Sequence, residues 1–390
     1  MVYLGIDVGK SHHAAALINS EGNTIATLPS FANTGAGFRK LLRFVSSHVS
    51  KEEELSVGIE ATGPYWIPLC RWGRKQGWEV TVLNPLKVAS LRNYGVRGSK
   101  TDRIDAVLVA HALRWEKRPP SDEPSYETLE LRHLTRLRSQ IIKDRTRISL
   151  RLISLLDTLF PELLTLFSKP ISPSTLAILE VAPTPQKVVA LGKENLTAIL
   201  RKASAGKLGQ ERAQQIIDAA QRSVGVPSET LEEVTALIVA QIRLLGEQLT
   251  TLNRRINELY ARTGLTLDTL PGVGTVLAAT FLGEFGDVNR FKGGTQMVAY
   301  AGIDPKLRES GSHQGQVRMS KRGSPYLRHA IYLAAQTAAR TDEYFQDILQ
   351  RQLKRGKSKR KALGAVMNRF IHVLYAVWKD NRAYSPLTPS

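Results

Sequence analysis

Cysteine is almost absent from this chain, since Cys70 is the only one in 390 residues. A single cysteine excludes an intramolecular disulfide framework and any zinc site built from cysteines. Hydrophobic residues make up 42% of the chain, but no apolar run approaches the length of a membrane span, so the sequence predicts a soluble protein. The N-terminus, MVYLGIDVGK, also lacks the basic region, apolar stretch and cleavage site of a signal peptide. We therefore expect a cytoplasmic protein.

Acidic residues are scarce relative to basic ones, with 35 Asp and Glu against 54 Lys and Arg and a formal net charge of +19. Such an excess concerns partners rather than fold, and nucleic acid is the commonest polyanionic partner. Seven Lys and Arg lie in 132–151 with one acid, and seven lie in 351–361 with none. A solvated face explains either run alone. The two runs and the overall imbalance together favour polyphosphate binding over a membrane surface.

Residues 1–118 combine strand and helix patterns. Three short strand patterns, the last two joined by the turn residues NSEGN, predict three antiparallel strands. Helix and strand patterns then alternate, which is the order of a ribonuclease H-like fold. The predicted strands are 2–9, 12–18, 24–31, 55–61 and 78–84, and the predicted helices are 36–48, 65–76, 86–94 and 102–116. We place this α/β domain at 1–120, with a linker at 116–124.

The rest of the chain has helical patterns. Apolar residues recur three, four or seven apart in 127–160 and 231–259, which predicts an antiparallel helical hairpin that could also pair with a second subunit. The insert at 166–228 is rich in Pro, Gly, Lys and Ala and predicts short helices. We expect a coiled-coil region at 121–265 and a mostly helical C-terminal domain at 266–390.

The C-terminal domain begins with LPGVGTVLAA, in which PGVG precedes an apolar helix. This pattern is typical of a helix-hairpin-helix segment. Its glycines permit the tight turn, and the N–H groups at the start of the next helix can meet a phosphate. The same turn also serves plain helix packing, so both interpretations stay open.

Two carboxylates three residues apart, Asp102 and Asp105 in SKTDRIDA, project from one face of a predicted helix. Acids in a first turn also simply favour the helix dipole, which is the plainer explanation of this pair alone. Asp7 in the first strand and Glu60 at the end of the fourth change the balance, because a carboxylate on a central strand is costly to bury without a cation. A ribonuclease H-like sheet would bring all four acids to one edge. They predict a site for one or two Mg²⁺ ions that polarise a scissile phosphate.

Other residues have simpler explanations. The opening LGIDVGKS also resembles actin-like ATPases and sugar kinases, but the later hairpin that those folds need has no strand candidate, so this alternative is weak. His12 and His13 face opposite ways on a strand, which favours packing over a metal site. Trp66, Trp72 and Trp78 are interpreted as core or interface aromatics.

Five motifs follow one another in the order of a known family: GIDVGKSHH, GIEATGPYW, SKTDRIDA, LPGVGTVLAA and AYAGIDPKLRESGSHQGQVRMSKRGSPYLR. On these motifs the chain resembles the DEDD transposases of bacterial insertion sequences. That family includes Piv-type DNA invertases and bridge-RNA-guided recombinases. The resemblance covers nearly all of 1–118 and 266–375, whereas 166–228 is an insertion that only some members have.

The resemblance implies a RuvC-like domain in which Asp7, Glu60, Asp102 and Asp105 form the metal-binding DEDD site. It also implies that Ser310, in RESGSHQG, is a nucleophile supplied by the C-terminal domain. The serine is expected to come from a different subunit than the carboxylates. A homo-oligomer, a dimer or a tetramer, follows from this arrangement.

Ser310 has competitors when the chain is considered without the resemblance. A serine in a Gly/Ser-rich loop is usually a turn residue, and Ser312 and Ser320 lie nearby. The motif RMSKRG adds three cations that are expected either to contact phosphates or to lie in a solvated loop. These cations are Arg318, Lys321 and Arg322.

The expected function is that of an insertion-sequence transposase that cuts and rejoins DNA strands through a serine nucleophile and a Mg²⁺ site. The resemblance implies double-stranded donor and target DNA as substrates and a structured noncoding guide RNA as a partner. The sequence has no zinc finger and no convincing helix-turn-helix, which fits surfaces suited to nucleic-acid backbones. The alternatives are a RuvC-like structure-specific nuclease, a Piv-like invertase and a nucleic-acid-binding protein without enzymatic activity.

Overall fold

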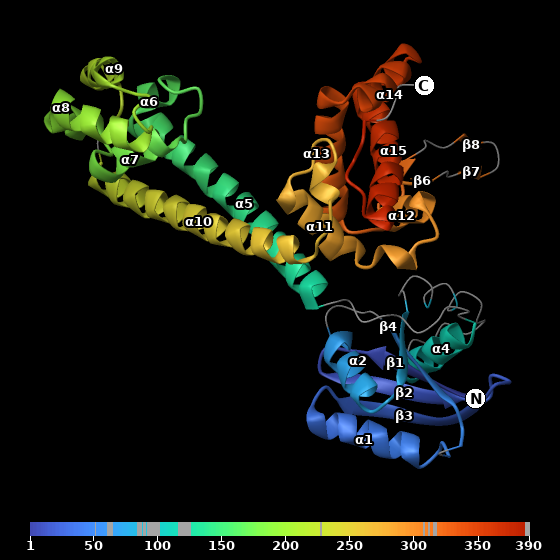
Figure 1. Cartoon of the computed structure of the whole chain (residues 1–390). Coiled ribbons are helices and arrows are strands. Elements are labelled where there is room, and N and C mark those ends of the chain that lie inside the picture. Colours follow the sequence, from blue (N-terminus) through green and yellow to red (C-terminus); the bar gives the residue numbers. More distant parts are fainter. Residues whose placement is uncertain are drawn as a thin grey trace. The chain divides into compact units, whose positions relative to one another are not determined.

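A computed structural model describes residues 1–50, 52–60, 65–83, 88, 91, 102–115, 126–226, 228–306, 309–310, 313–314 and 318–386. The chain divides into two compact units, Met1–Glu123 and Pro124–Ser390 (Figure 1). The predicted linker at 116–124 and most of the predicted helix at 86–94 lie outside the described residues. Among the helices that the structure describes, none has both the length and the apolar character needed to cross a bilayer.

A five-stranded sheet with the order β3-β2-β1-β4-β5 forms the centre of the first unit. β1, β2 and β3 pair antiparallel, as predicted, and β4 and β5 add parallel pairing next to β1. Each strand lies within one residue of its predicted range. The strands are β1 (Val2–Val8), β2 (His12–Ile18), β3 (Thr24–Ala32), β4 (Leu55–Glu60) and β5 (Glu79–Leu83).

Helices cover both faces of this sheet. α1 (Gly35–Ser46) and α2 (Trp66–Lys75) share one buried cluster with Leu4 and Ile6 of β1. Because side chains alternate along a strand, the residues between them face the opposite side, where α4 (Asp102–Arg114) packs. The hydroxyl oxygen of Thr34 accepts from the N–H of Gly37 and caps the start of α1.

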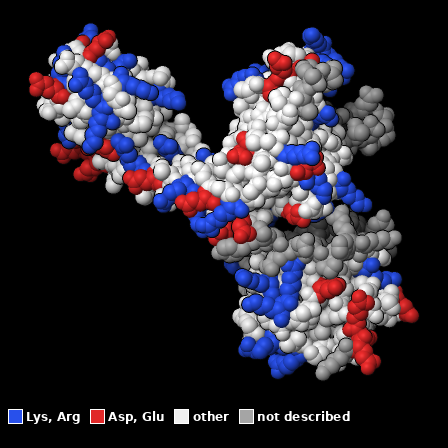
Figure 2. Space-filling view, in the orientation of Figure 1, with Lys and Arg blue, Asp and Glu red and all other residues white. Residues whose placement is uncertain are grey.

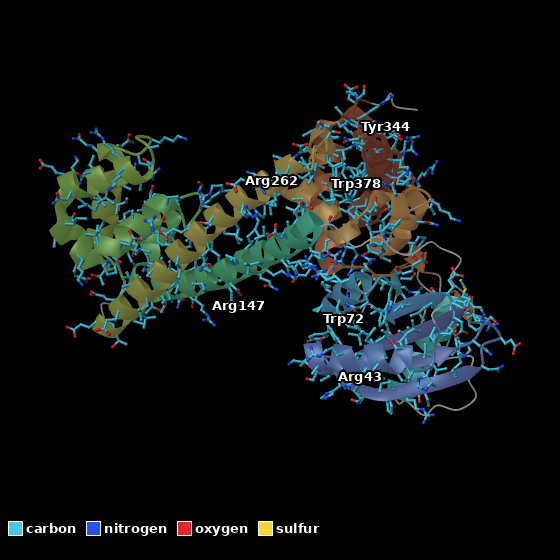
Figure 3. All side chains as sticks on the ribbon, turned by 60° about the horizontal axis from the view of Figure 1, so that its bottom comes forward. Arg43, Trp72, Arg147, Arg262, Tyr344 and Trp378 are labelled. Atoms are coloured by element: carbon cyan, nitrogen blue, oxygen red, sulfur yellow. The ribbon has the colours of Figure 1, made fainter. Side chains whose placement is uncertain are left out.

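Aromatic side chains fill the core beneath α1 and α2. Trp72 lies in the first unit (Figure 3). Its ring meets Trp78 edge-on at 5.4 Å between centroids and lies 5.4 Å from Phe38. His13 is buried and its ring lies 5.1 Å from Phe31. Burial lowers the pKa of His13, so the neutral form is favoured. These contacts confirm the interpretation of the two tryptophans and of His13 as packing residues.

The second unit is built on a long antiparallel helix hairpin. α5 (Tyr126–Leu159) and α10 (Glu229–Arg262) pack along each other, which confirms the prediction. Leu152 of α5 and Val239 of α10 belong to a hydrophobic cluster with the insert. Leu131 and Leu259, at the opposite end of the hairpin, belong to the core of the C-terminal helices. The hairpin therefore links two separate cores within this unit.

The described residues of the insert form helices, as predicted, and a further short helix directly precedes it. Proline occupies the first turn of three of them, where its missing N–H costs no hydrogen bond. α8 contains a kink at Gly192, where φ is +78°. α6 (Pro161–Thr165) precedes the insert, and the helices within it are α7 (Pro173–Val181), α8 (Pro185–Ala203) and α9 (Gln210–Gln221).

The C-terminal part is also mainly helical. α11 follows the PGVG turn, as predicted, and a Cβ on Gly272 would lie 2.6 Å from the carbonyl oxygen of Ala334. Packing on α13 thus accounts for this glycine, whose φ is +77°. The helices are α11 (Thr275–Phe285), α12 (Gly294–Ala301), α13 (Pro325–Thr341), α14 (Glu343–Lys354) and α15 (Lys359–Asp380), with short 3₁₀ turns at Leu267–Thr269 and Val288–Arg290.

Candidate functional site

Two of the predicted acids lie at the same edge of the sheet in the first unit. β1 and β4 are parallel and their register pairs Ile6 with Ile59, so Asp7 and Glu60 follow one residue later on neighbouring strands. Since side chains alternate, both carboxylates project from the same face of the sheet. Glu60 is only 7% exposed, whereas Asp7 is half-buried.

α4 packs on that same face because two glycines let it approach the strands. A Cβ on Gly5 of β1 would lie 2.2 Å from the backbone nitrogen of Ala110 and 2.3 Å from the carbonyl oxygen of Ala106. A Cβ on Gly58, the strand partner of Gly5, would meet the Leu113 side chain at 3.1 Å. The helix therefore lies directly on the sheet, and side chains larger than hydrogen would displace it.

The start of α4 lies toward the edge that carries Asp7. Ala106 forms a buried cluster with Ala14 and Ala16 of β2, and Ala14 is the strand partner of Asp7. Asp105 precedes Ala106 and is 3% exposed, so its carboxylate is buried at the foot of this helix. Asp102 is the first residue of α4, but its side chain lies outside the described part of the structure.

The donor set at this edge consists of carboxylates, the ligands preferred by a hard divalent cation such as Mg²⁺. Within the described side chains, no three acids, histidines or cysteines lie close enough together to hold a metal ion. That search leaves out the Asp102 carboxylate. Asp7, Glu60 and Asp105 are among the described side chains, so the structure does not bring these three carboxylates around one ion position, although their donor chemistry is that of a hard-cation site.

Ser310 lies between residues 305 and 319, a segment that we call the arm and whose described residues form two pairs of short strands. β6 (Pro305–Lys306) pairs with β9 (Arg318–Met319) near its base, and β7 (Glu309–Ser310) pairs with β8 (His313–Gln314) further out. The register places Ser310 opposite His313. The Ser310 and Arg318 side chains and the whole of Ser312 lie outside the described residues.

The predicted phosphate-contacting cations follow this arm. Lys321 and Arg322 are exposed directly after β9, and Lys321 has a φ of +54°. Ser320, the competitor of Ser310, donates its hydroxyl hydrogen to Oδ1 of Asp304 at 2.5 Å. Sequence reasoning did not identify Asp304, although the quoted motif AYAGIDPK contains it.

The basic run at 132–151 is partly used inside the second unit. Arg136 forms a two-pronged ion pair with Glu284 at 2.6 and 2.9 Å. Arg132 donates to the carbonyl oxygen of Gly283 at 2.5 Å, and Arg138 donates to the Asn253 side chain at 2.6 Å. The sequence analysis included these three cations among those expected to bind a polyanion. In the structure they instead form hydrogen bonds that hold helices together. The sequence feature that indicates this role is Glu284 in the apolar segment TVLAATFLGEF, because a buried carboxylate needs a cationic partner inside the protein.

The basic run at 351–361 remains at the surface. All residues from 354 to 361 are exposed, six of these eight are Lys or Arg, and none of the six forms an ion pair with a residue that the structure describes. α15 begins here with cations and no acid in its first turn. Figure 2 shows Lys and Arg over the visible face of both units, with Asp and Glu interspersed among them.

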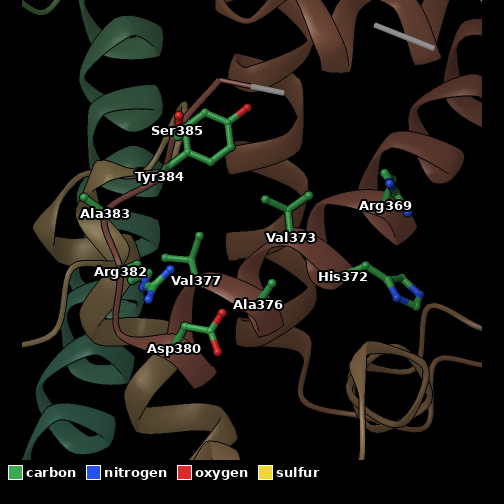
Figure 4. A pocket seen from close by; sticks show the side chains of 10 residues that line it. All are labelled: Arg369, His372, Val373, Ala376, Val377, Asp380, Arg382, Ala383, Tyr384 and Ser385. Atoms are coloured by element: carbon green, nitrogen blue, oxygen red, sulfur yellow. The ribbon is translucent and has the colours of Figure 1, made fainter. Parts of the chain in front are cut away.

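A pocket of about 340 Å³ lies between α15 and the segment at 382–385 (Figure 4). Its lining combines Arg369 and Arg382 with Asp380 and apolar side chains. Tyr384 in its wall donates its hydroxyl hydrogen to Asp342 at 2.9 Å, which fixes the segment to the helices. None of the residues that line this pocket is a predicted site residue.

Comparison with known proteins identifies the class. A family described as a transposase matches residues 4–161, which include the β1, β4 and α4 acids. A second family, the transposase IS116/IS110/IS902 family, matches residues 265–350, which include the Ser310 arm. These two matches together cover more than half of the chain and define a transposase.

Several curated relatives match along nearly their whole length. An insertion element IS116 protein of Streptomyces clavuligerus is 26% identical, with 100% of this chain and 97% of the relative covered. An insertion element IS110 protein of Streptomyces coelicolor is 28% identical, with 100% and 96% covered. The pilin gene-inverting protein of Moraxella bovis is 26% identical, with 98% and 97% covered. The chain belongs to the IS116/IS110/IS902 family of transposases.

Proposed function

We propose that this transposase cuts DNA with Ser310 as the nucleophile and a carboxylate-bound divalent cation, and then rejoins the strands. The observation that carries the proposal is the position of Asp7 and Glu60 on neighbouring parallel strands, on one face of the sheet. α4 packs on that face, and Asp105 is buried in the first turn of α4. The order of these elements supports a ribonuclease H-like domain of the RuvC type. Asp102 would complete the four-carboxylate set.

The proposed chemistry is a transesterification. The Ser310 oxygen forms an ester bond with a DNA phosphorus while one bond from that phosphorus to a deoxyribose oxygen breaks. The serine loses its proton, and the leaving sugar oxygen gains one. One phosphoester replaces another, so the bond energy is kept for rejoining strands, whereas attack by water would lose it.

Each group has a distinct role in this proposal. The divalent cation, for which Mg²⁺ is the expected identity, stabilises negative charge on the attacking and leaving oxygens when it is bound. Asp7, Glu60, Asp102 and Asp105 would hold it. Lys321 and Arg322, with Arg318, are proposed to contact phosphates beside the serine, because the two described cations are exposed directly after the arm.

A strand-transfer assay with defined donor and target duplexes tests the proposal. The wild-type protein is expected to need a divalent cation and to leave a protein–DNA adduct on denaturing gels. Ser310→Ala and Asp102→Asn should both abolish strand transfer. The runner-up, a RuvC-like structure-specific nuclease, predicts instead that Ser310→Ala still cuts DNA. A binding protein without activity predicts that Asp7→Asn and Glu60→Gln change nothing measurable.

Inversion of a DNA segment is a second candidate outcome of the same chemistry. It is favoured by the similarity to a pilin gene-inverting protein over nearly the whole chain. A plasmid carrying two element ends in inverted orientation separates the candidates, because inversion keeps the plasmid length and transposition changes it.

Further partners are part of the proposal. A structured guide RNA would supply sequence recognition, and the exposed basic run at 354–361 supports contact with a nucleic-acid backbone. Sequencing of RNA that co-purifies with the protein tests this partner. Since the substrate would be cellular DNA, we propose the cytoplasm as the place of action.

A homo-oligomer, a dimer or tetramer, is proposed because the helix hairpin exposes large apolar side chains. Leu150 on α5 is 61% exposed, and Leu237 and Leu244 on α10 are 66% and 54% exposed. In such an assembly the serine and the carboxylates of one active site would come from different subunits.

A further inference from the structure

Two segments that are distant in the sequence run directly against each other at the base of the Ser310 arm. We call residues 300–304 and 320–323 the arm base. The N–H of Ser320 donates to the carbonyl oxygen of Asp304 at 2.9 Å, and the N–H of Lys321 donates to that of Gly302 at 3.0 Å. The pairing of β6 with β9 continues directly from these bonds, so the arm base sets where the arm begins.

Two glycines make the close approach of these segments possible. Gly302 has a φ of +69°, and a Cβ there would lie 2.6 Å from the backbone nitrogen of Gly323. A Cβ on Gly323 would lie 2.2 Å from the carbonyl oxygen of Tyr300. Both contacts are with backbone atoms, which cannot rotate away as a flexible side chain can. The arm base is therefore a built feature of the fold.

One side-chain hydrogen bond crosses the arm base. The Ser320 hydroxyl donates to Oδ1 of Asp304 at 2.5 Å, and both residues are half-buried. Hydroxyl donors to a carboxylate form short, strong hydrogen bonds. This bond joins the residue directly before the arm to the residue directly after it.

The described pairing within the arm is short. Among the residues that the structure describes, β6 pairs with β9 and β7 with β8 over two residues per strand, and an isolated two-stranded hairpin is at best marginally stable in water. The arm base therefore fixes the two ends, at 304 and 320, between which Ser310 lies.

We propose that Asp304 and Ser320 are positioning residues for the nucleophile, which they orient by closing the arm base. This inference rests on the proposed function, because it takes Ser310 as the attacking residue. Misplacement of a reacting group by about 1 Å costs on the order of 10²-fold in rate, so loss of this bond should slow the chemical step more than it weakens DNA binding.

The test measures single-turnover formation of the protein–DNA adduct by the full-length protein at saturating duplex DNA and divalent cation. Ser320→Ala and Asp304→Asn should slow adduct formation by about 10- to 100-fold, with the Kd for DNA changed less than about twofold. Ser320→Thr keeps the hydroxyl and should restore most of the rate. Ser223→Ala is the matched control, because Ser223 donates to Glu162 at the same 2.5 Å in the insert.

Each outcome decides something. Adduct formation by Ser320→Ala at the wild-type rate overturns the inference, and so does a rate loss that Ser223→Ala reproduces. A covalent phosphopeptide that maps to Ser320 also overturns it, since Asp304 would then be the base of a different nucleophile. If the wild-type protein forms no adduct at all, the proposed function itself fails. If the adduct maps to Ser310 and Ser320→Ala is unimpaired, only this inference fails.

Discussion

At the scale of single residues, the buried carboxylate of Glu284 is neutralised by a cation from another helix of the second unit. Its carboxylate is 2% exposed within the apolar helix α11, and Arg136 of α5 reaches it with two nitrogens. This hydrogen-bonded pair raises the pKa of Arg136. Arg136 also lies over the Tyr326 ring, 5.2 Å from its centroid. One guanidinium thus ties the hairpin to both α11 and α13.

Removal of this guanidinium should destabilise the protein strongly. Arg136→Ala leaves the Glu284 carboxylate buried without its partner, and we expect a loss of about 2–3 kcal/mol in the free energy of unfolding, near the lower end for such pairs because Arg136 is 40% exposed. Urea unfolding followed by circular dichroism measures it. Arg147→Ala removes a 3.4 Å pair with Asp144 between exposed side chains and should cost about 0–1 kcal/mol. Equal losses in the two variants would contradict this account.

At the scale of elements, the contact of α4 with the sheet places the start of that helix at the acidic edge. Gly5→Ala puts a methyl group within 2.2 Å of the Ala110 backbone, so α4 must move away. We expect a loss of about 1–3 kcal/mol in stability and loss of strand transfer. Gly246→Ala is the control, because that site in the interior of α10 has open space and should gain about 0.5–1 kcal/mol. A fully active Gly5→Ala protein would show that the approach of α4 is not needed.

The first turn of α15 is the element that we expect to contact nucleic-acid phosphates. Replacement of Lys359, Arg360 and Lys361 by Gln should make the slope of log affinity against log salt shallower by about 2–3, since each lost phosphate contact removes about 0.9 from the slope on duplex DNA. Fluorescence anisotropy over a salt series measures it. The control replaces three exposed cations of α8, at 193, 201 and 202, for the same change in charge. Equal effects of the two triple variants would mean that net charge alone matters.

The elements themselves were largely predictable. Each strand and long helix carries its own period of apolar residues, and turn residues such as NSEGN mark the reversals, so the pattern fixes β1 to β5, α5 and α10. The uses of individual polar groups were not predictable in the same way. The Arg136–Glu284 pair joins residues 148 apart in the sequence, and the Asp304–Ser320 bond joins residues 16 apart. The period of apolar residues does not predict such tertiary contacts.

The candidate site was predictable to a similar extent. Asp7 could be assigned to the first strand and Glu60 to the end of the fourth, and the fold expected from the strand order then placed them together, as the β1–β4 register has it. The glycines at 5 and 58 were in the sequence, but their function as contact points for α4 became evident only with the packing. The identity of the nucleophile came from family resemblance alone, because Ser310, Ser312 and Ser320 are chemically equivalent in the sequence.

At the scale of the whole molecule, the exposed apolar side chains of the hairpin predict an assembly of copies. Leu237→Ser with Leu244→Ser should shift the protein toward the monomer without loss of helicity, because these leucines are proposed to pack on a second subunit. Sedimentation equilibrium measures the mass. Val224→Ser, at an 80% exposed residue between α9 and α10, is the control. An unchanged mass distribution in the double variant would exclude this face as the interface.

The central claim is that acids from distant parts of the chain converge to bind a divalent cation. The most direct measurement is an anomalous difference map from crystals of the full-length protein grown with Mn²⁺ in place of Mg²⁺. The account predicts a peak bounded by carboxylate oxygens of Asp7, Glu60 and the start of α4, and no such peak in the Asp7→Asn, Glu60→Gln variant. A wild-type map without manganese at this edge, or a peak that persists in the variant, would contradict it.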